Sequence, residues 1–150
     1  MLSKAVVCSA LVALATVSAA TQSAAQSAAP TASVVAAGEL KWTDVPDTPA
    51  KMATVKGDAA KGPHASFIKL PGGFSAPLHS HTADHNVVVV SGTLTMTVEG
   101  GAAKKLGPGS WFEFTGKKKH VTTCDAGADC VLFIAAKAAW DLVPADPAKK

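Results

Sequence analysis

The chain has 150 residues, 48% of them hydrophobic, with 14 basic and 11 acidic side chains and a formal net charge of +3. This length suits one domain with a single core and is too short for two. The basic residues are all lysines, so the bidentate arginine contacts that read phosphates and bases are excluded, and we expect no nucleic-acid partner.

Residues 1–20 have the pattern of a bacterial-type signal peptide. Lys4 supplies a positive charge, and the apolar run that follows it is too short to span a bilayer. Small residues at 18–20 suit cleavage. We therefore expect a periplasmic or secreted protein whose mature chain has no transmembrane segment.

The rest of the chain divides by composition into three parts. Residues 21–38 carry no charge and consist mainly of Ala, Ser, Gln and Thr, which is typical of a flexible linker. The folded domain is expected over residues 39–145. A short C-terminal tail follows over residues 146–150.

The domain offers short apolar or alternating runs separated by Gly, Pro and Asp, with no long amphipathic helix. This pattern indicates an all-β barrel or sandwich. Turns at Gly92 and Gly100–Gly101 link successive strands and imply an antiparallel sheet. The expected strands are 40–45, 52–56, 64–70, 76–81, 86–91, 93–99, 110–114, 120–124 and 131–136.

The three tryptophans, Trp42, Trp111 and Trp140, are expected to pack in the core or at a barrel end, since large aromatics dominate the cores of small domains. Trp111 and Glu113 share one face of their strand and two phenylalanines share the other. Trp111 therefore has an alternative role, the lining of a ligand cavity. Glu113 is expected to face solvent, and an inward general base is the alternative.

Two cysteines, Cys124 and Cys130, flank the turn-like segment 125–129. We expect them to lie opposite each other across a hairpin and to form a disulfide, which would persist in a periplasm. The competing interpretation is that Cys124, four positions after His120, is a free thiol that points into a pocket.

Four of the five histidines form one pattern. Histidines two apart on a strand, such as His79 and His81, point to the same face with Cα atoms about 6.5 Å apart, so both rings can reach one ion. A short polar link then lets His85 approach from the neighbouring strand, and His120 lies on a later strand-like segment. The alternative is a chance alignment of core or surface histidines. His64, outside the pattern, is expected at the surface.

The frame around these residues resembles the first motif of the cupin superfamily. Gly73-x5-His79-x-His81-x3-His85-x6-Gly92 keeps every spacing of Gly-x5-His-x-His-x3,4-Glu-x6-Gly. His85 stands where the family usually has glutamate. The resemblance therefore implies a metal site made of imidazoles alone.

The second cupin motif, Gly-x5-Pro-x-Gly-x2-His-x3-Asn, is matched less closely. Gly109 and His120 fit it, whereas Thr115, Lys117 and Cys124 replace the proline, the second glycine and the asparagine. The metal-binding histidine is kept and the turn residues around it are not.

The resemblance covers roughly residues 39–143 and implies a single cupin-type antiparallel β-barrel, also called a double-stranded β-helix or jelly roll. It implies one divalent transition metal, Mn, Fe, Zn, Ni or Cu, which neutral imidazoles accept. Without a carboxylate ligand the ion keeps its full charge and acts as a strong Lewis acid toward water or an anion. The implied metal ligands are His79, His81, His85 and His120.

The expected partner is a small molecule. Lys117, Lys118 and Lys119 are expected in a solvated loop, and the alternative is that they rim the mouth of the metal pocket and attract an anionic ligand. Because cupins often dimerise through their sheets, a homodimer is also implied.

The leading functional hypothesis is a secreted mononuclear metal cupin with oxygenase-type chemistry, whose catalytic acid and base the sequence does not name. A non-catalytic periplasmic module that binds a metal or senses a small anion is the first alternative. A zinc-dependent hydrolase or cyclase is the second. Fold alone does not choose among them.

Overall fold

The computed structural model describes residues 31–145. The expected signal peptide, the first ten residues of the expected linker and the C-terminal tail lie outside the described residues. No helix within residues 31–145 is long and apolar enough to cross a membrane.

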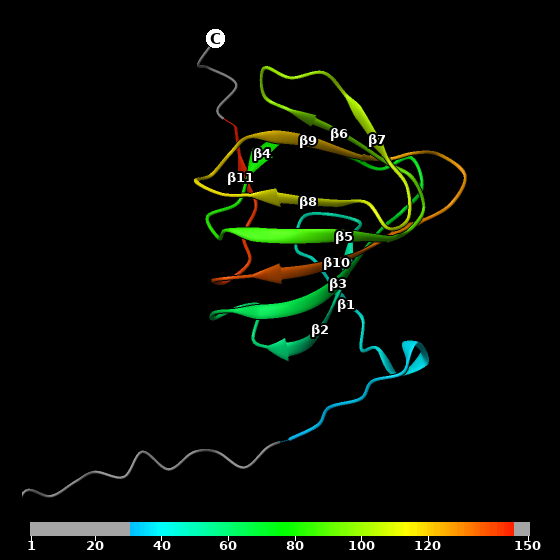
Figure 1. The fold of residues 1–150 in the computed structure, drawn as a ribbon, viewed down its shortest axis with the longest axis vertical. Helices are drawn as coiled ribbons and strands as arrows, with labels where there is room; N and C mark the ends of the chain where they lie inside the picture. The colour runs from blue at the N-terminus through cyan, green and yellow to red at the C-terminus, as the bar shows by residue number, and fades with distance from the viewer. Residues whose placement is uncertain (1–30, 146–150) are drawn as a thin grey trace, which may run out of the picture. The chain divides into compact units, whose positions relative to one another are not determined.

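The strands form two antiparallel sheets (Figure 1). Sheet A has six strands in the order β1-β2-β3-β10-β5-β8, and sheet B has five in the order β11-β4-β9-β6-β7. The elements are the short 3-10 helix η1 (Ala37–Glu39), β1 (Thr43–Asp44), β2 (Lys51–Gly57), β3 (His64–Leu70), β4 (Ser75–Ser80), β5 (His85–Ser91), β6 (Leu94–Val98), β7 (Lys104–Leu106), β8 (Trp111–Phe114), β9 (His120–Cys124), β10 (Cys130–Ala136) and β11 (Val143–Pro144).

The chain passes back and forth between the sheets. From β3 to β6 each strand lies in the opposite sheet from the one before it, and the same is true from β8 to β11. Strands that follow one another therefore face each other across the interior. This arrangement confirms the predicted all-β, antiparallel jelly-roll fold.

Alternation along the strands builds the core. In β3 and β10 every second side chain is buried, as expected when successive side chains point to opposite faces of a sheet. The buried residues of the two sheets meet in one apolar cluster. Its larger members include Ile68, Val89, Leu94, Met96, Leu132 and Ile134.

The expected strands 64–70 and 120–124 coincide with β3 and β9. The run 40–45 forms a strand only at β1, because the residues before it lead in from η1. The sequence did not predict β7 or β11. Both are very short, lie at the edges of sheet B and expose most of their side chains, so neither has an alternating apolar pattern.

The two glycine turns differ. Gly100–Gly101 joins β6 to β7 in an antiparallel hairpin, as expected. Gly92 instead carries the chain from β5 in sheet A to β6 in sheet B, so the prediction that it links strands of one sheet is wrong. Its φ is +79°, and a Cβ there would lie 2.8 Å from the Cα of Cys130, which explains why the turn needs glycine.

Cys124 and Cys130 form a disulfide with a Cα–Cα distance of 5.7 Å. Because β9 and β10 lie in different sheets, the bond fastens sheet B to sheet A and does not close a hairpin. Both side chains are fully buried. The alternative interpretation of Cys124 as a free thiol in the pocket is wrong.

Trp111 is 60% exposed, so the prediction that it packs in the core is wrong, as is its alternative as a cavity residue. The alternation of β8 turns Phe112 and Phe114 inward and places Trp111 and Glu113 on the outer face of sheet A. Glu113 is exposed, as expected. Trp42 is half-buried, with the Nζ of Lys69 4.7 Å above its ring.

His64 is buried, with 5% of its surface exposed, so the expectation of a surface position is wrong. It is the first residue of β3, and the alternation of that strand turns it toward the interior. Its Nδ1 lies 3.1 Å from the carbonyl of Gly62. Its Nε2 has no hydrogen-bond partner among the described residues.

Candidate metal centre

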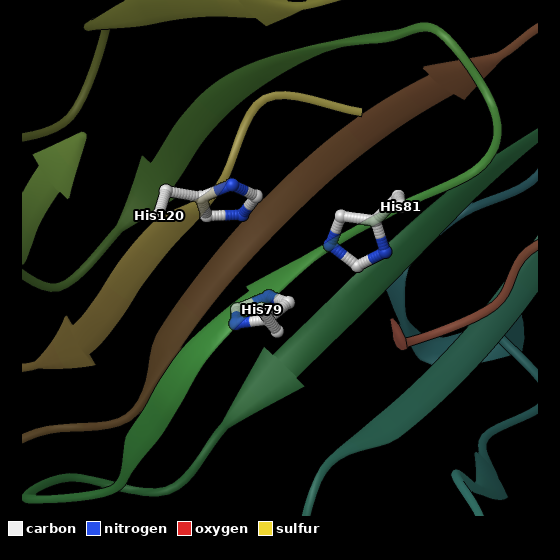
Figure 2. Close-up of side chains that lie close together, drawn as sticks. All are labelled: His79, His81 and His120. Atoms are coloured by element: carbon white, nitrogen blue, oxygen red, sulfur yellow. The ribbon is translucent and has the colours of Figure 1, made fainter. Parts of the chain in front are cut away.

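Three histidines meet at one end of the interior (Figure 2). His79 lies on β4, His81 follows directly after that strand, and His120 begins β9. His79 and His120 are opposite each other in the β4–β9 register. Each of the three offers one ring nitrogen, and these nitrogens lie within 4.8 Å of one another. A single ion can therefore be reached by all three.

His85 lies beside this group and outside it. Its ring centroid is 4.8 Å from that of His81, with the two planes nearly perpendicular. The expectation that His85 approaches from the neighbouring strand is wrong in one respect. Since β5 belongs to sheet A and β4 to sheet B, His85 faces His81 from the opposite sheet.

Each of the four rings presents its Nδ1 to a backbone carbonyl. A carbonyl oxygen only accepts hydrogen bonds, so Nδ1 carries the proton and the lone pair is left on Nε2. Such a contact fixes both the tautomer and the orientation of a metal-binding imidazole. The partners are Pro77 for His79 at 2.6 Å, Ala83 for His85 at 2.8 Å, Lys118 for His120 at 3.0 Å and Asp141 for His81.

Burial lowers the pKa of all four imidazoles. It lowers the pKa of His81 to about 3 and that of His120 to about 4, and it shifts the pKa values of His79 and His85 in the same direction. The low dielectric of the interior disfavours the charged ring. At neutral pH the rings are therefore neutral, and no proton competes with a metal for Nε2.

Aromatic side chains fix the planes of two rings. Phe114 stacks on His120 with centroids 4.0 Å apart and planes 8° from parallel. Trp140 stacks on His81 at 4.1 Å and 28°, and it meets the ring of His85 edge-on at 5.1 Å. The donors are thus held in place before any ion binds.

The four rings line a cavity of about 80 Å³ between the two sheets. Its other walls are mainly aliphatic and aromatic, and Thr48 and Thr122 supply hydroxyl groups. No carboxylate or lysine is among the described residues that line it. The cavity therefore combines one end lined by histidines with an apolar remainder.

The lysine run does not line the cavity. Lys117 and Lys118 are exposed, and the Nζ of Lys119 lies 3.5 Å from the carboxylate of Glu99. Their contribution to the site is through the backbone, because the carbonyl of Lys118 accepts the Nδ1 proton of His120. Lys117 has a left-handed backbone with φ of 59°, at the position where the cupin motif has glycine.

A family model described as a domain of unknown function, DUF4437, matches residues 16–143. The chain belongs to the DUF4437 family. No curated protein matches this DUF4437 sequence.

Several solved structures similar to this DUF4437 chain are described as cupins. The polyketide cyclase RemF from Streptomyces resistomycificus is 16% identical with a TM-score of 0.66, over 79% of this chain and 89% of that one. A cupin-2 domain protein from Rhodospirillum rubrum is 14% identical with a TM-score of 0.62, over 80% and 84%. The lyase DddQ from Ruegeria pomeroyi DSS-3, which acts on DMSP, is 16% identical with a TM-score of 0.60, over 75% and 64%. At these identities the likeness establishes the fold, which is that of the cupin superfamily.

The spacing of the four histidines in this DUF4437 domain was recognisable in the sequence, whereas the residues that orient them were not. Phe114 and the carbonyl of Asp141 carry no local signal for this role. Trp140 does carry one, since it is a single large aromatic that follows a mostly alanine segment just after the last long strand.

Proposed function

We propose that the protein is a mononuclear metal cupin that acts on a small molecule. The ion would be held by the Nε2 atoms of His79, His81 and His120, with His85 as the fourth donor. The observation that carries the proposal is the set of four Nδ1–carbonyl contacts, which leave every Nε2 lone pair available in a buried, neutral site. The residues therefore fit a divalent transition metal.

The ligand is proposed to be a small anion with an apolar body. Neutral donors leave the charge of a divalent ion uncompensated, and burial of such a charge in apolar surroundings favours an anionic partner. The aliphatic and aromatic walls suit a hydrocarbon remainder. The cavity, about 80 Å³, limits that remainder to a few carbon atoms in this conformation.

The reaction is proposed to be of the oxygenase type. Hydrolysis and cyclisation depend on positioned proton donors and acceptors. Apart from the histidines, the described residues that line the cavity offer the hydroxyls of Thr48 and Thr122 and no stronger acid or base. A redox-active ion would supply dioxygen chemistry, while the chain binds and orients the substrate and excludes water. This lining makes the zinc-dependent hydrolase or cyclase the weaker alternative.

A non-catalytic module that binds a metal or senses a small anion is the second candidate. The cavity volume favours it, because sites for larger substrates usually enclose about 300 Å³ or more. Either function would be carried out in the periplasm or outside the cell. The disulfide supports that location, since such bonds persist in oxidising compartments.

Elemental analysis of protein purified from its native compartment, followed by dioxygen measurements, tests the proposal. We expect about one Fe, Mn, Cu or Ni per chain and dioxygen uptake with a short-chain carboxylate or enolate. Zinc with no uptake would favour the hydrolase or cyclase. A bound metal with no turnover of any small anion would favour the binding module, and a chain without metal would refute the site.

A further inference from the structure

The segment that follows β10, residues 137–145, crosses from sheet A to sheet B over the histidine end of the cavity; we call it the C-terminal strap. Backbone hydrogen bonds hold it along its length, and β11 within it pairs with β4 opposite Ser80 and His79. The bonds run from the Lys137 amide to the Asp84 carbonyl at 2.9 Å, from Trp140 to Ala59 at 2.7 Å and from Ala145 to Leu78 at 2.9 Å.

His81 depends on this strap in a way that the other histidines do not. His79, His85 and His120 each donate Nδ1–H to a carbonyl two residues earlier, so their own strands or loops orient them. The Nδ1 of His81 donates to the carbonyl of Asp141, 60 positions later. If the strap moves away, His81 loses the partner that fixes its tautomer and ring orientation.

Trp140 forms the second contact between the strap and the site. Its indole stacks on His81 and meets the edges of His85 and His64, at 6.2 Å for the latter. Ala136, on β10, lies between His64 and His85 in sheet A. Trp140 and Leu142 also line the cavity, so the strap is one of its walls.

The loop after β4 locks the strap at the same point. The amide of Thr82, next to His81, donates to the carboxylate of Asp141 at 2.7 Å. Beyond this point the strap is held by its backbone and buries little side-chain surface, since β11 has two residues and Leu142 and Val143 are 39% and 41% exposed. Segments that have few buried apolar contacts typically open locally while the rest of the domain stays folded.

We propose that Trp140 and Asp141 are positioning residues for His81, and that docking of the C-terminal strap and metal binding stabilise each other. The inference rests on the proposed metal site. A metal on Nε2 makes the Nδ1–H of an imidazole a stronger donor, which strengthens its bond to the carbonyl of Asp141. The coupling is reciprocal, because whatever the ion adds to docking, docking adds to the affinity for the ion.

The first test measures the affinity for Zn²⁺, with a chromophoric chelator as competitor, in Trp140→Ala, Trp140→Phe and Trp111→Ala. We expect Trp140→Ala to weaken binding about tenfold or more, the size of effect seen when groups that orient metal ligands are lost. Trp140→Phe keeps a ring against His81 and should restore most of the affinity. Trp111→Ala, which removes an exposed indole on sheet A, should leave it unchanged.

The second test measures amide hydrogen exchange in residues 137–145 with and without Zn²⁺. Added metal should slow exchange across the C-terminal strap and leave the β6–β7 hairpin unaffected. In Trp140→Ala the metal-dependent protection should be lost, while circular dichroism confirms that the variant is folded.

The outcomes separate the two proposals. If the parent protein and Trp140→Ala bind Zn²⁺ equally well, the strap inference is wrong and the metal site stands. The same conclusion follows if Zn²⁺ does not change the rate of amide exchange in the strap. If the parent protein binds no Zn²⁺, both are wrong.

Discussion

The ring of His120 lies flat against the ring of Phe114, which is itself 7% exposed. The contact fixes the plane of a proposed metal ligand from the opposite sheet. We expect Phe114→Leu to lower metal affinity about tenfold while it lowers stability by about 1 kcal/mol, since an apolar residue of similar volume replaces the ring. Metal competition and urea unfolding measure the two effects. Phe67→Leu, on the outer face of sheet A, is the matched control, and equal affinity in both variants would contradict the role of Phe114.

Removal of a histidine that binds the metal should have a different effect from removal of the buried histidine outside the site. We expect His81→Ala and His120→Ala to abolish stoichiometric metal while the domain stays folded, because a core of this size need not depend on the ion. His64→Ala removes a buried imidazole outside the site and should keep the metal. Elemental analysis after dialysis measures the metal content of each variant. Normal metal content in both His81→Ala and His120→Ala would refute the site.

The stability of the metal-free protein should fall in mild acid. Burial lowers the pKa of His81 from 6.5 to about 3, so between these values the unfolded chain takes up a proton that the folded chain excludes. The contribution of neutral His81 to the free energy of unfolding is fully present above about pH 6.5. It is lost as the pH falls toward 3, at up to about 1.4 kcal/mol per pH unit. Urea unfolding at pH 7.5, 6 and 5 measures the slope. A shallower slope in His81→Ala is expected, and a flat profile in the parent protein would contradict the assignment.

Reduction of the disulfide should destabilise the fold without disturbing the metal. Closure of so short a loop is expected to contribute about 2 kcal/mol. Cys124 and His120 lie at opposite ends of β9, so the histidines should keep their arrangement. Denaturant unfolding with and without reductant measures the change, and Cys124→Ala/Cys130→Ala should reproduce it. A large loss of metal on reduction would contradict this separation.

Sheet A is expected to mediate a homodimer through its outer face. Val88, Val90 and Trp111 are 36%, 46% and 60% exposed there, on the adjacent strands β5 and β8. A lysine in place of Trp111 would put a charge into an apolar contact, so Trp111→Lys should be a monomer by light scattering. Lys104→Glu, which changes a charge on sheet B, should leave the dimer intact. A monomeric parent protein would rule out the expectation.

The cupin motif shows how much of the site local sequence can predict. Gly73 and Gly92, which frame the histidines, have φ values of +84° and +79°, where an L side chain is strained. The spacing of the motif therefore reflects two positions that need a positive φ as well as the positions of the histidines. Lys117 adopts a similar conformation without being glycine, which explains why the second motif is harder to recognise.

The sequence by itself determined the all-β class, the positions of the long strands and the four histidines, because alternation and residue spacing are local properties of the chain. It determined that Trp111 and Phe112 point to opposite faces of their strand. Only the tertiary structure decided which face looks inward. It also decided that the chain changes sheets between β4 and β5, which places His85 across the interior from His81.

The contacts that orient His81 belong wholly to the tertiary structure. Asp141 and Trp140 reach it from the C-terminal strap, and no periodicity links residues 60 positions apart. The path of the chain after β10 is held by the pairing of the strap with β4 and by its backbone hydrogen bonds to Asp84 and Ala59. Local sequence specifies which side chains can bind a metal, and the closure of distant segments around the cavity decides how they are held.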